Sequence, residues 1–457
     1  MNAPRNIAVI DIGKTNAKLA LVDLQTLTEI AVVTRPNTVH SGPPWPHFDV
    51  EGHWTFLLDA LGQFHRTHGI DGISITTHGA CAALLRKDGS LAAAILDYEH
   101  SFPADVIAAY DAIRPPFELT GSPLLPGGLN LGAQLYWQFS EDTTLHERTA
   151  SIVPYPQYWG HRLTGKIASD VASIGCHTDL WLPTKRRFSS LVESLGLTDK
   201  IAPVVQSTKR LGHITPDVAA QTGLSPSTPV AVGIHDSNAS FYPHLLTQSG
   251  PFSVVSTGTW VIAMSSGSEA VQLDQTRDTL MNVNAIGAPL PSARFMGGRE
   301  YEVIQQGQAA IATADDIAAV LRAGVMLLPA VEPSTGPFQG KRMRWVGAEP
   351  AVGTGQRSVA LAFYLAMMTE TCLELTGAQG PTIVEGPFAQ NHPYLSMLAT
   401  ATDRPILQSR SETGTSIGAA LLFGNSPALE PATPLEITHS DVELHSYAIK
   451  WRNHITQ

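Results

Sequence analysis

The pattern that most constrains the fold of this chain is a strand, a polar turn and a second strand, which occurs once in each half. The first copy spans 6–24, with apolar runs on both sides of the turn Asp11–Asn16. The second spans 251–264 around the turn Ser256–Thr259. Such a separation is too long for a solenoid repeat but suits a duplicated protein whose two domains open with the same hairpin. We therefore predict two domains, 1–246 and 247–457.

The segments between the hairpins have α/β patterning. Short apolar runs at 70–77 and 229–233 predict buried strands, and helical patterns lie between them, as at 54–65. In the second half, 359–375 and 391–402 predict helices on either side of a strand at 381–384. A chain of 457 residues is long enough for two domains, each with its own core.

Composition restricts the class of partner. The chain has 29 basic and 40 acidic residues, a formal charge of −11, which argues against a nucleic-acid partner. Three cysteines fit reduced thiols in a cytoplasmic protein better than a disulfide framework. We see no apolar run of membrane-spanning length, so we expect no membrane partner. A homodimer is left open.

The first turn is not a P-loop. Gly13-Lys14-Thr15 resembles the end of that motif, but Ala8 stands where its first glycine is required. A helix should also follow the loop, whereas the residues after Asn16 predict a strand. A dinucleotide-binding fingerprint fails for the same reasons.

A hairpin turn that binds phosphate remains. Gly13 allows close approach to the backbone N–H groups, and Thr15 and Asn16 add neutral donors. Asp11, at the end of the strand, suits Mg²⁺ held directly or through water. Lys14 would add a charge-assisted contact to a phosphate. An ordinary hairpin turn is the alternative.

The second turn strengthens the phosphate interpretation. Ser256-Thr257-Gly258-Thr259 offers three hydroxyls and a glycine. Two such turns facing each other across a cleft could hold the triphosphate of ATP from both sides.

Asp236 is the candidate catalytic base. It follows the predicted strand 229–233, and strand ends in α/β sheets face the ligand crevice. Its carboxylate could accept the proton of a substrate hydroxyl that attacks a γ-phosphorus. The alternative is a helix N-cap.

The ordered set of motifs resembles the FGGY carbohydrate kinases, within the actin, hexokinase and Hsp70 ATPase superfamily. The resemblance spans nearly the whole chain. Its motifs match the first phosphate turn at Asp11, Gly13, Thr15 and Lys18, the second at Ser256–Thr259, the base element at Gly233 and Asp236, an adenosine element at 385–391, and the terminal element at 418–420. Within the adenosine element, Gly386 and Asn391 are the expected nucleotide contacts.

The resemblance implies two actin-like (ribonuclease H-like) α/β domains with an ATP cleft between them. It implies transfer of the γ-phosphoryl group of ATP, with Mg²⁺, to a small sugar, with ketoses of the xylulose, ribulose, fuculose or rhamnulose type as candidates. Four residues depart from the family pattern: Lys14 in the first turn, Glu385 and Pro387 on the adenosine side, and Gln134 before Trp137.

The resemblance also places the sugar site. His78 and Gly79 match the segment of polar sugar contacts after the strand at 73–76, and Asp97 aligns with a substrate-facing loop. A structural histidine and a solvated charged loop are the alternatives for His78 and Asp97.

Three other functions are weaker. Gly414-Thr415-Ser416-Ile417-Gly418, followed by Asp441 and His445, matches a hydrolase nucleophile motif, but the residues before it are too polar for the strand it needs. His65 and His68 could share a helix face as metal ligands, yet no third ligand is evident. An ATP-driven conformational switch without sugar phosphorylation is the rival from another class, and Asp236 favours the kinase.

Overall fold

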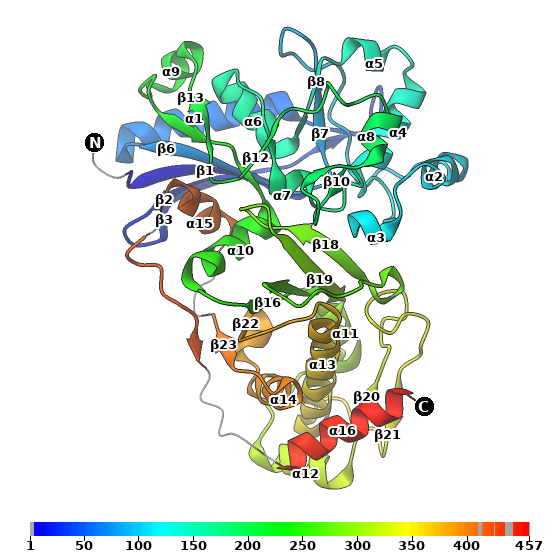
Figure 1. Cartoon of the computed structure of the whole chain (residues 1–457). Helices are drawn as coiled ribbons and strands as arrows, with labels where there is room; N and C mark the ends of the chain where they lie inside the picture. Colours follow the sequence, from blue (N-terminus) through cyan, green and yellow to red (C-terminus); the bar gives the residue numbers. More distant parts are fainter. Residues whose placement is uncertain (1–3, 410–413, 425, 435–441, 457) are drawn as a thin grey trace. The chain divides into compact units, whose positions relative to one another are not determined.

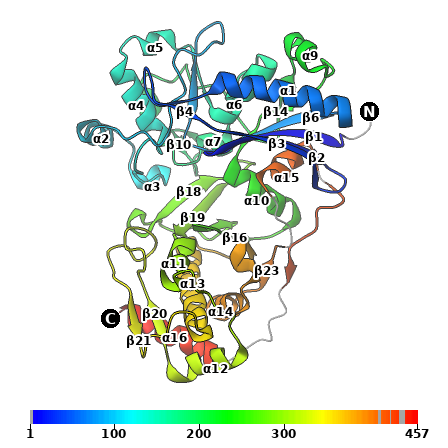
Figure 2. The ribbon, with the colours of Figure 1, turned by 180° about the vertical axis from the view of Figure 1, so that it is seen from behind.

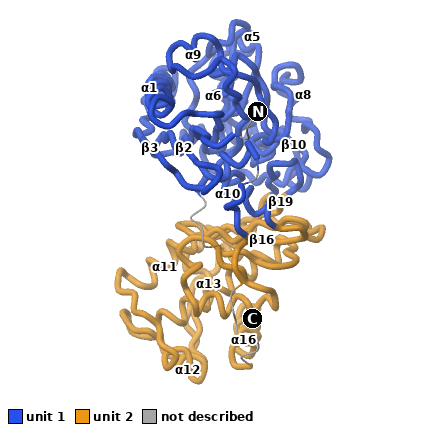
Figure 3. The backbone as a smooth tube through the Cα atoms, turned by 90° about the vertical axis from the view of Figure 1, so that its left-hand side faces the viewer, with its two compact units in different colours: residues 1–247, 281–289, 413–430 blue, residues 248–280, 290–412, 431–457 orange. Residues whose placement is uncertain are grey.

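The structure is a computed structural model that describes residues 4–409, 414–424, 426–434 and 442–456. The chain divides into two compact units (Figure 3). Unit 1 comprises 1–247, 281–289 and 413–430, and unit 2 comprises 248–280, 290–412 and 431–457. Two short segments of unit 1 thus come from the part of the chain that the sequence places in the C-terminal domain, 247–457.

Unit 1 is built on a mixed sheet with the order β13-β14-β6-β1-β2-β3, in which β15 also pairs with β6. β1 pairs antiparallel with β2 and parallel with β6. The strands are β1 (Asn6–Ile12), β2 (Asn16–Asp23), β3 (Thr28–Pro36), β6 (Gly72–Thr77), β13 (Arg210–His213), β14 (Pro229–Ala231) and β15 (Ile234–His235). Shorter strands outside this sheet are β4 (Val39–His40), β5 (His47–Phe48), β7 (Ala82–Leu85), β8 (Ser151–Pro154), β9 (Ser169–Asp170), β10 (Trp181–Leu182), β11 (Arg187–Phe188) and β12 (Val204–Val205).

Helices cover both faces of this sheet (Figures 1 and 2). The helices of unit 1 are α1 (Val50–His68), α2 (Ala104–Asp111), α3 (Phe117–Thr120), α4 (Leu131–Glu141), α5 (Leu145–Arg148), α6 (Tyr155–Thr164), α7 (Val171–Ile174), α8 (Ser190–Ser194), α9 (Pro216–Thr222), α10 (Asp236–Thr247) and α15 (Thr415–Ala420). Of these, α1, α6, α10 and α15 contact strands of the sheet. Successive side chains of β1 enter different cores: Ala8 and Ile10 pack on the side of α1 and α6, while Ile7 and Val9 pack with α10 and α15. Burial on both faces explains why β1 reads as an uninterrupted apolar run.

Unit 2 repeats the strand order of unit 1. Its sheet includes the sequence β19-β17-β16-β22-β23-β24, so β16, β17 and β22 take the places of β1, β2 and β6. The strands are β16 (Phe252–Thr257), β17 (Val261–Ser266), β19 (Pro289–Phe295), β22 (Thr382–Glu385), β23 (Ile406–Gln408) and β24 (Thr433–Pro434), with β20 (Met326–Leu328) and β21 (Arg344–Val346) as a separate pair. β18 (Thr279–Val283) carries the chain from unit 2 into unit 1. The prediction of two α/β domains that open with the same hairpin is confirmed.

The core of unit 2 surrounds α13 (Gly355–Leu375). Around it lie α11 (Gly297–Gln305), α12 (Ala314–Ala323), α14 (His392–Thr402) and α16 (Val442–Thr456). By length and hydropathy, α13 could cross a membrane, contrary to the expectation that no run is long enough. However, 83% of its most apolar 18-residue window is buried inside the protein, as in the core helix of a globular domain. It begins earlier than predicted because the Thr354 side chain caps it by accepting a bond from the N–H of Arg357.

The crossing of α10 and α15 depends on the absence of a side chain at Gly418. A Cβ atom there would lie 1.8 Å from the carbonyl oxygen of Ala239. We predict that Gly418→Ala lowers the free energy of unfolding by about 1–3 kcal/mol, because the two helices must separate. Urea denaturation measures this. Gly250→Ala is the matched control, since a Cβ at Gly250 meets nothing within 4 Å. Equal midpoints for the two variants would contradict the close-packing explanation.

Candidate active site

The first predicted phosphate turn joins β1 to β2 in unit 1. The strands stay paired up to Ile12 and Ala17, and the N–H of Gly13 donates to the carbonyl oxygen of Asn16 at 2.9 Å. For a Cβ built on Gly13, the nearest atom is that same oxygen, at 3.6 Å. Thr15 and Asn16 are exposed. The turn therefore has open space beside its backbone, as a phosphate-binding turn requires.

Asn37, which the sequence did not single out, fixes the shape of this turn. Its backbone N–H donates to the carbonyl oxygen of Thr15 at 2.9 Å, and its side-chain amide donates to that of Gly13 at 2.8 Å. The amide oxygen of Asn37 faces Nε2 of His53 at 2.8 Å, and Arg35 contacts the other ring nitrogen at 2.9 Å. Burial lowers the pKa of His53 to about 4, so its ring is neutral at neutral pH and can donate to Asn37.

Asp11 ends β1 beside the turn, as predicted. Its Oδ2 atom accepts from the hydroxyl of Thr415 at 2.5 Å, and Nζ of Lys18 lies 3.4 Å away. Burial raises the pKa of Asp11, while Thr415 and Lys18 oppose the rise. The described residues contain no group of three His, Cys, Asp or Glu side chains that could hold a metal by themselves. One carboxylate fits Mg²⁺, which takes its other ligands from phosphates and water.

Asp236 stands at the first position of α10, directly after β15. The strand β14 ends before Gly233 because this residue takes a φ of +94°, which favours glycine. The Asp236 side chain is 31% exposed, and its Oδ1 lies 3.2 Å from Nε2 of His235. Oδ1 also accepts from the N–H of Ser237 at 2.6 Å, whereas an N-cap side chain bonds the second or third N–H of the helix. The carboxylate thus remains accessible for chemistry.

The charge of Asp236 acts on Asp11. Burial raises the pKa of Asp236, and His78 opposes the rise. Burial is also the main cause of the raised pKa of Asp11, and the negative charge of Asp236 adds to it. The two carboxylates both belong to unit 1 and lie close enough for this charge to be felt.

His78 is buried among aromatic rings of the same unit. Its ring centroid lies 5.1 Å from those of Phe48, Tyr98 and Tyr155. Its Nδ1 contacts the carbonyl oxygen of Gly79 at 2.9 Å, whereas Nε2 is buried without a hydrogen-bond partner. Burial lowers the pKa of His78 to about 4. A neutral ring that donates through Nδ1 leaves Nε2 as an acceptor, which a substrate hydroxyl could satisfy.

Gly79 has a packing role that its sequence context does not show. A Cβ atom at this position would lie 2.7 Å from Nε2 of His235. Glycine here therefore makes room for the histidine that contacts Asp236.

The side chain of Lys14 contacts two carboxylates. Its Nζ lies 2.5 Å from Oδ1 of Asp97 and 3.0 Å from Oε2 of Glu99. The sequence predicted that this ammonium contacts a phosphate, whereas in the structure its partners are two carboxylates. The backbone N–H of Lys14 still belongs to the turn.

The second predicted phosphate turn joins β16 to β17 in unit 2. Gly258 and Thr259 are exposed, but Thr257 is buried. The Thr257 hydroxyl donates to the carbonyl oxygen of Glu385 at 2.6 Å and accepts from the N–H of Phe388 at 3.0 Å. This hydroxyl therefore connects the turn to the adenosine element. Because the hydroxyl is already bonded at both ends, only the backbone of Thr257 is left to contact a phosphate.

The adenosine element packs tightly against this turn. Gly386 has a φ of +80°, and a Cβ there would lie 2.0 Å from the carbonyl oxygen of Thr257. Asn391 caps α14, since its side-chain oxygen accepts from the N–H of Tyr394 at 3.1 Å. The element begins with a short 3₁₀ helix, Pro387–Gln390, which accommodates the proline that departs from the family pattern.

Gln134 also has a structural explanation. Its side-chain amide is buried in α4 and donates to the carbonyl oxygens of Ala80 and Gly128. It therefore stabilises the loop that follows the predicted sugar-contact segment.

The hydrolase alternative gains no support. Ser416 is buried in α15, and its hydroxyl lies 3.4 Å from Oδ2 of Asp11. Asp441 lies outside the described residues, and His445 belongs to α16 of the other unit.

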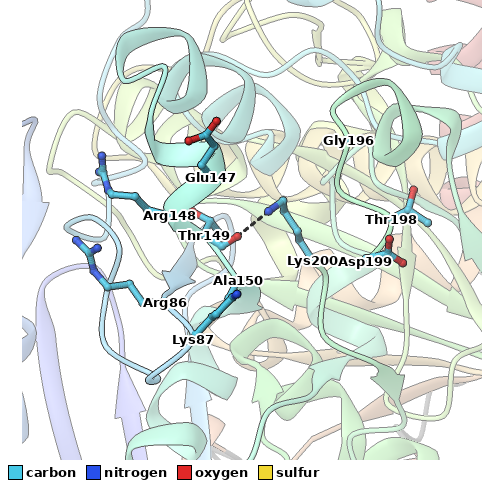
Figure 4. A pocket seen from close by; sticks show the side chains of 10 residues that line it. All are labelled: Arg86, Lys87, Glu147, Arg148, Thr149, Ala150, Gly196, Thr198, Asp199 and Lys200. Carbon is cyan, nitrogen blue, oxygen red and sulfur yellow. Dashed lines mark hydrogen bonds between the residues drawn. The ribbon is translucent and has the colours of Figure 1, made fainter.

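A surface pocket of about 750 Å³ lies elsewhere in unit 1 (Figure 4). Cations and two acids line it, among them Lys200, whose ammonium donates to the carbonyl oxygens of Thr149 at 2.7 Å and His146 at 3.0 Å. The predicted site residues do not line this pocket. Lys200 has a structural role, because its ammonium bonds backbone carbonyl oxygens at the end of α5.

Comparisons with known proteins agree with the motifs. A family model described as "FGGY family of carbohydrate kinases, N-terminal domain" matches residues 6–242, and one described as "Carbohydrate kinase FGGY, C-terminal domain" matches 249–431. L-fuculokinase of Escherichia coli K12 is 25% identical over 267 residues, 56% of each chain. Rhamnulokinase of Pectobacterium carotovorum is 26% identical over 271 residues, 56% of this chain and 52% of the relative. These alignments span about half the length of the curated relatives.

Solved structures match along the whole chain. A carbohydrate kinase from Novosphingobium aromaticivorans is 33% identical with a TM-score of 0.90, covering 100% of this chain and 99% of its own. A xylulose kinase from Rhodospirillum rubrum is 18% identical with a TM-score of 0.77, covering 99% and 98%, and so supports the fold alone. Because both family models match in order and the fold agrees over the full length, the chain belongs to the FGGY family of carbohydrate kinases.

Proposed function

We propose that this protein is an ATP-dependent kinase that transfers the γ-phosphoryl group of ATP to a hydroxyl of a small sugar. The observation that carries the proposal is the Asp236 carboxylate. It is partly exposed at the start of α10, and its negative charge adds to the raised pKa of Asp11. A base beside a phosphate-binding turn is the arrangement that phosphoryl transfer to an alcohol needs.

Each group has one task in the reaction. The sugar hydroxyl oxygen attacks the γ-phosphorus and gives its proton to Asp236, while the bond from that phosphorus to the β-phosphate oxygen breaks and ADP leaves. The backbone at 13–16 and 257–259 holds phosphate oxygens, and Asp11 would hold Mg²⁺. When bound, the metal neutralises charge on the phosphates. His78 accepts a substrate hydroxyl at Nε2, its buried unpartnered atom.

The remaining assignments follow the family. Gly386 and Asn391 border the adenosine site, and Gly79 and Asp97 the sugar site. Ketoses of the xylulose, ribulose, fuculose or rhamnulose type are the proposed substrates, supported by relatives described as fuculokinase and rhamnulokinase. The described cysteines are buried and none of them forms a disulfide, which suits the reducing cytoplasm that we propose as its location.

Asp236→Asn tests the proposed base. We expect kcat for sugar phosphorylation to fall by about 10²–10⁴-fold with the fold retained, because the amide keeps the shape but cannot accept the proton. Coupled ADP release over a panel of ketoses, aldoses and polyols measures the effect. Asp59→Asn, an exposed position on α1, is the matched control.

Two results would contradict the kinase assignment. Near-wild-type turnover of Asp236→Asn would remove the base from the mechanism. Wild-type ATPase activity that no sugar on the panel changes would favour an ATP-driven conformational switch instead.

The acid side of the pH profile tests the environment of Asp236. The ionised carboxylate is the base, and burial raises its pKa. We therefore expect kcat/KM for the sugar to decline on acidification with a midpoint above pH 4, near which an ordinary aspartate titrates. His78 has a pKa of about 4 and stays neutral over most of this range. A profile that stays flat down to pH 4 would exclude a raised pKa for the base.

Asn37→Ala tests the support of the first turn. Losing the side-chain bond to the carbonyl oxygen of Gly13 should raise KM for ATP about tenfold, equivalent to about 1.4 kcal/mol, because the loosened turn presents its N–H groups less well. KM for the sugar should change less. Asn453→Ala, which truncates an exposed amide in α16, is the control. Unchanged KM for ATP would show that Asn37 does not set the geometry of the turn.

A further inference from the structure

Lys14 belongs to the first phosphate turn, yet its side chain reaches the segment that carries Asp97. Its Nζ contacts Asp97 at 2.5 Å and Glu99 at 3.0 Å, and it lies 4.9 Å from the ring centroid of Tyr98 and 5.5 Å from that of Phe48. These are the aromatic rings that surround His78. The ammonium is therefore placed on the sugar side of the turn, held by charge and by ring faces.

The contact between Lys14 and Asp97 is largely shielded from solvent. The Asp97 side chain is only 9% exposed and that of Lys14 is 24% exposed, whereas Glu99 is 62% exposed. Oδ1 of Asp97 also accepts from the N–H of Glu99 at 3.2 Å. These two bonds to Oδ1, one of them from a charged donor, fix the orientation of the Asp97 carboxylate.

One N–H donor of the Lys14 ammonium is available to a ligand. An ammonium group has three N–H donors and no acceptor. Asp97 and Glu99 take one each, so the third can bond an oxygen of a bound molecule. One cation facing two carboxylates gives this cluster a formal charge of −1. A neutral hydroxyl or carbonyl oxygen suits such a cluster, while a carboxylate or a phosphate meets net repulsion.

We propose that the Lys14 side chain is a sugar-specificity residue, which positions Asp97, donates to a substrate oxygen, and with Glu99 selects neutral polyhydroxylated substrates over sugar acids. This inference rests on the proposed kinase function and deepens it. It also replaces the expected contact between the ammonium and a phosphate, and leaves phosphate binding by the turn to its backbone.

The neighbours of Lys14 place it on the sugar side of unit 1. The rings of Phe48 and Tyr98 lie beside both its ammonium and the ring of His78. The positive charge of Lys14 also helps to lower the pKa of His78. The ammonium therefore lies close to the proposed sugar contact.

Lys14→Met is the first test, since it keeps an unbranched apolar stem of similar shape and removes the ammonium. KM for the sugar should rise about tenfold or more, the size expected for losing hydrogen bonds to a charged group. The Kd of ATP, measured by calorimetry without sugar, should stay within about twofold of wild type. A merely structural role would weaken both ligands together, and an ammonium on phosphate would weaken ATP. Either result would overturn the proposal.

Glu99→Gln is the second variant and keeps the test decisive if Lys14→Met folds poorly, because this side chain is largely exposed. It removes one negative charge, so the aldonate that corresponds to the preferred sugar should become a better competitive inhibitor, with a Ki at least about threefold lower. Glu51→Gln, on α1, is the matched control. An unchanged Ki would contradict charge selection at Glu99.

The wild-type enzyme separates this inference from the proposed function. If it phosphorylates no sugar of the panel, the kinase function itself fails. If it phosphorylates a sugar acid better than neutral sugars, the kinase function stands and the assignment of Lys14 and Glu99 is wrong.

Discussion

The proposed chemistry depends on a backbone turn that is held rigid from outside. N–H groups bind phosphate well only when their directions are fixed beforehand, because ordering them during binding would cost conformational free energy. Asn37 provides this constraint with one bond to each of Gly13 and Thr15. The neutral ring of His53 in turn fixes the Asn37 amide. In unit 2, Thr257 plays a comparable part by binding its own turn to the adenosine element.

The short helix α15 connects the parts of unit 1 that carry the carboxylates. Its first residue bonds Asp11, Gly418 lets it approach α10, and the carbonyl oxygen of Ala419 accepts from Ser74 on β6 at 2.6 Å. A segment from the end of the chain thereby completes the unit that contains its beginning. Glycine and alanine in this helix are explained by close packing between helices and a sheet, where larger side chains would separate the partners.

Most of the correct predictions from the sequence came from local patterns of apolar and glycine residues. The two hairpins, their turns and the strand before Asp236 follow from apolar periodicity and from glycine, so they could be predicted without a structure. The contacts of Asn37 and Thr415 could not, because each joins segments far apart in the chain. Lys14 shows the same limit, since a turn sequence identifies its backbone but not the direction of a long flexible side chain.

The distribution of charge explains how one unit can serve anions and a neutral sugar together. Asp11 faces Lys18 and a hydroxyl, so its charge is partly balanced where a metal and phosphates would add their own. Burial raises the pKa of Asp236, so its carboxylate is a stronger base than that of a solvated aspartate. On the sugar side, two carboxylates balance the charge of Lys14. In the proposed role, this separate local compensation would keep the ammonium from competing with the metal for phosphate oxygens, and would direct it to the substrate that distinguishes one sugar kinase from another.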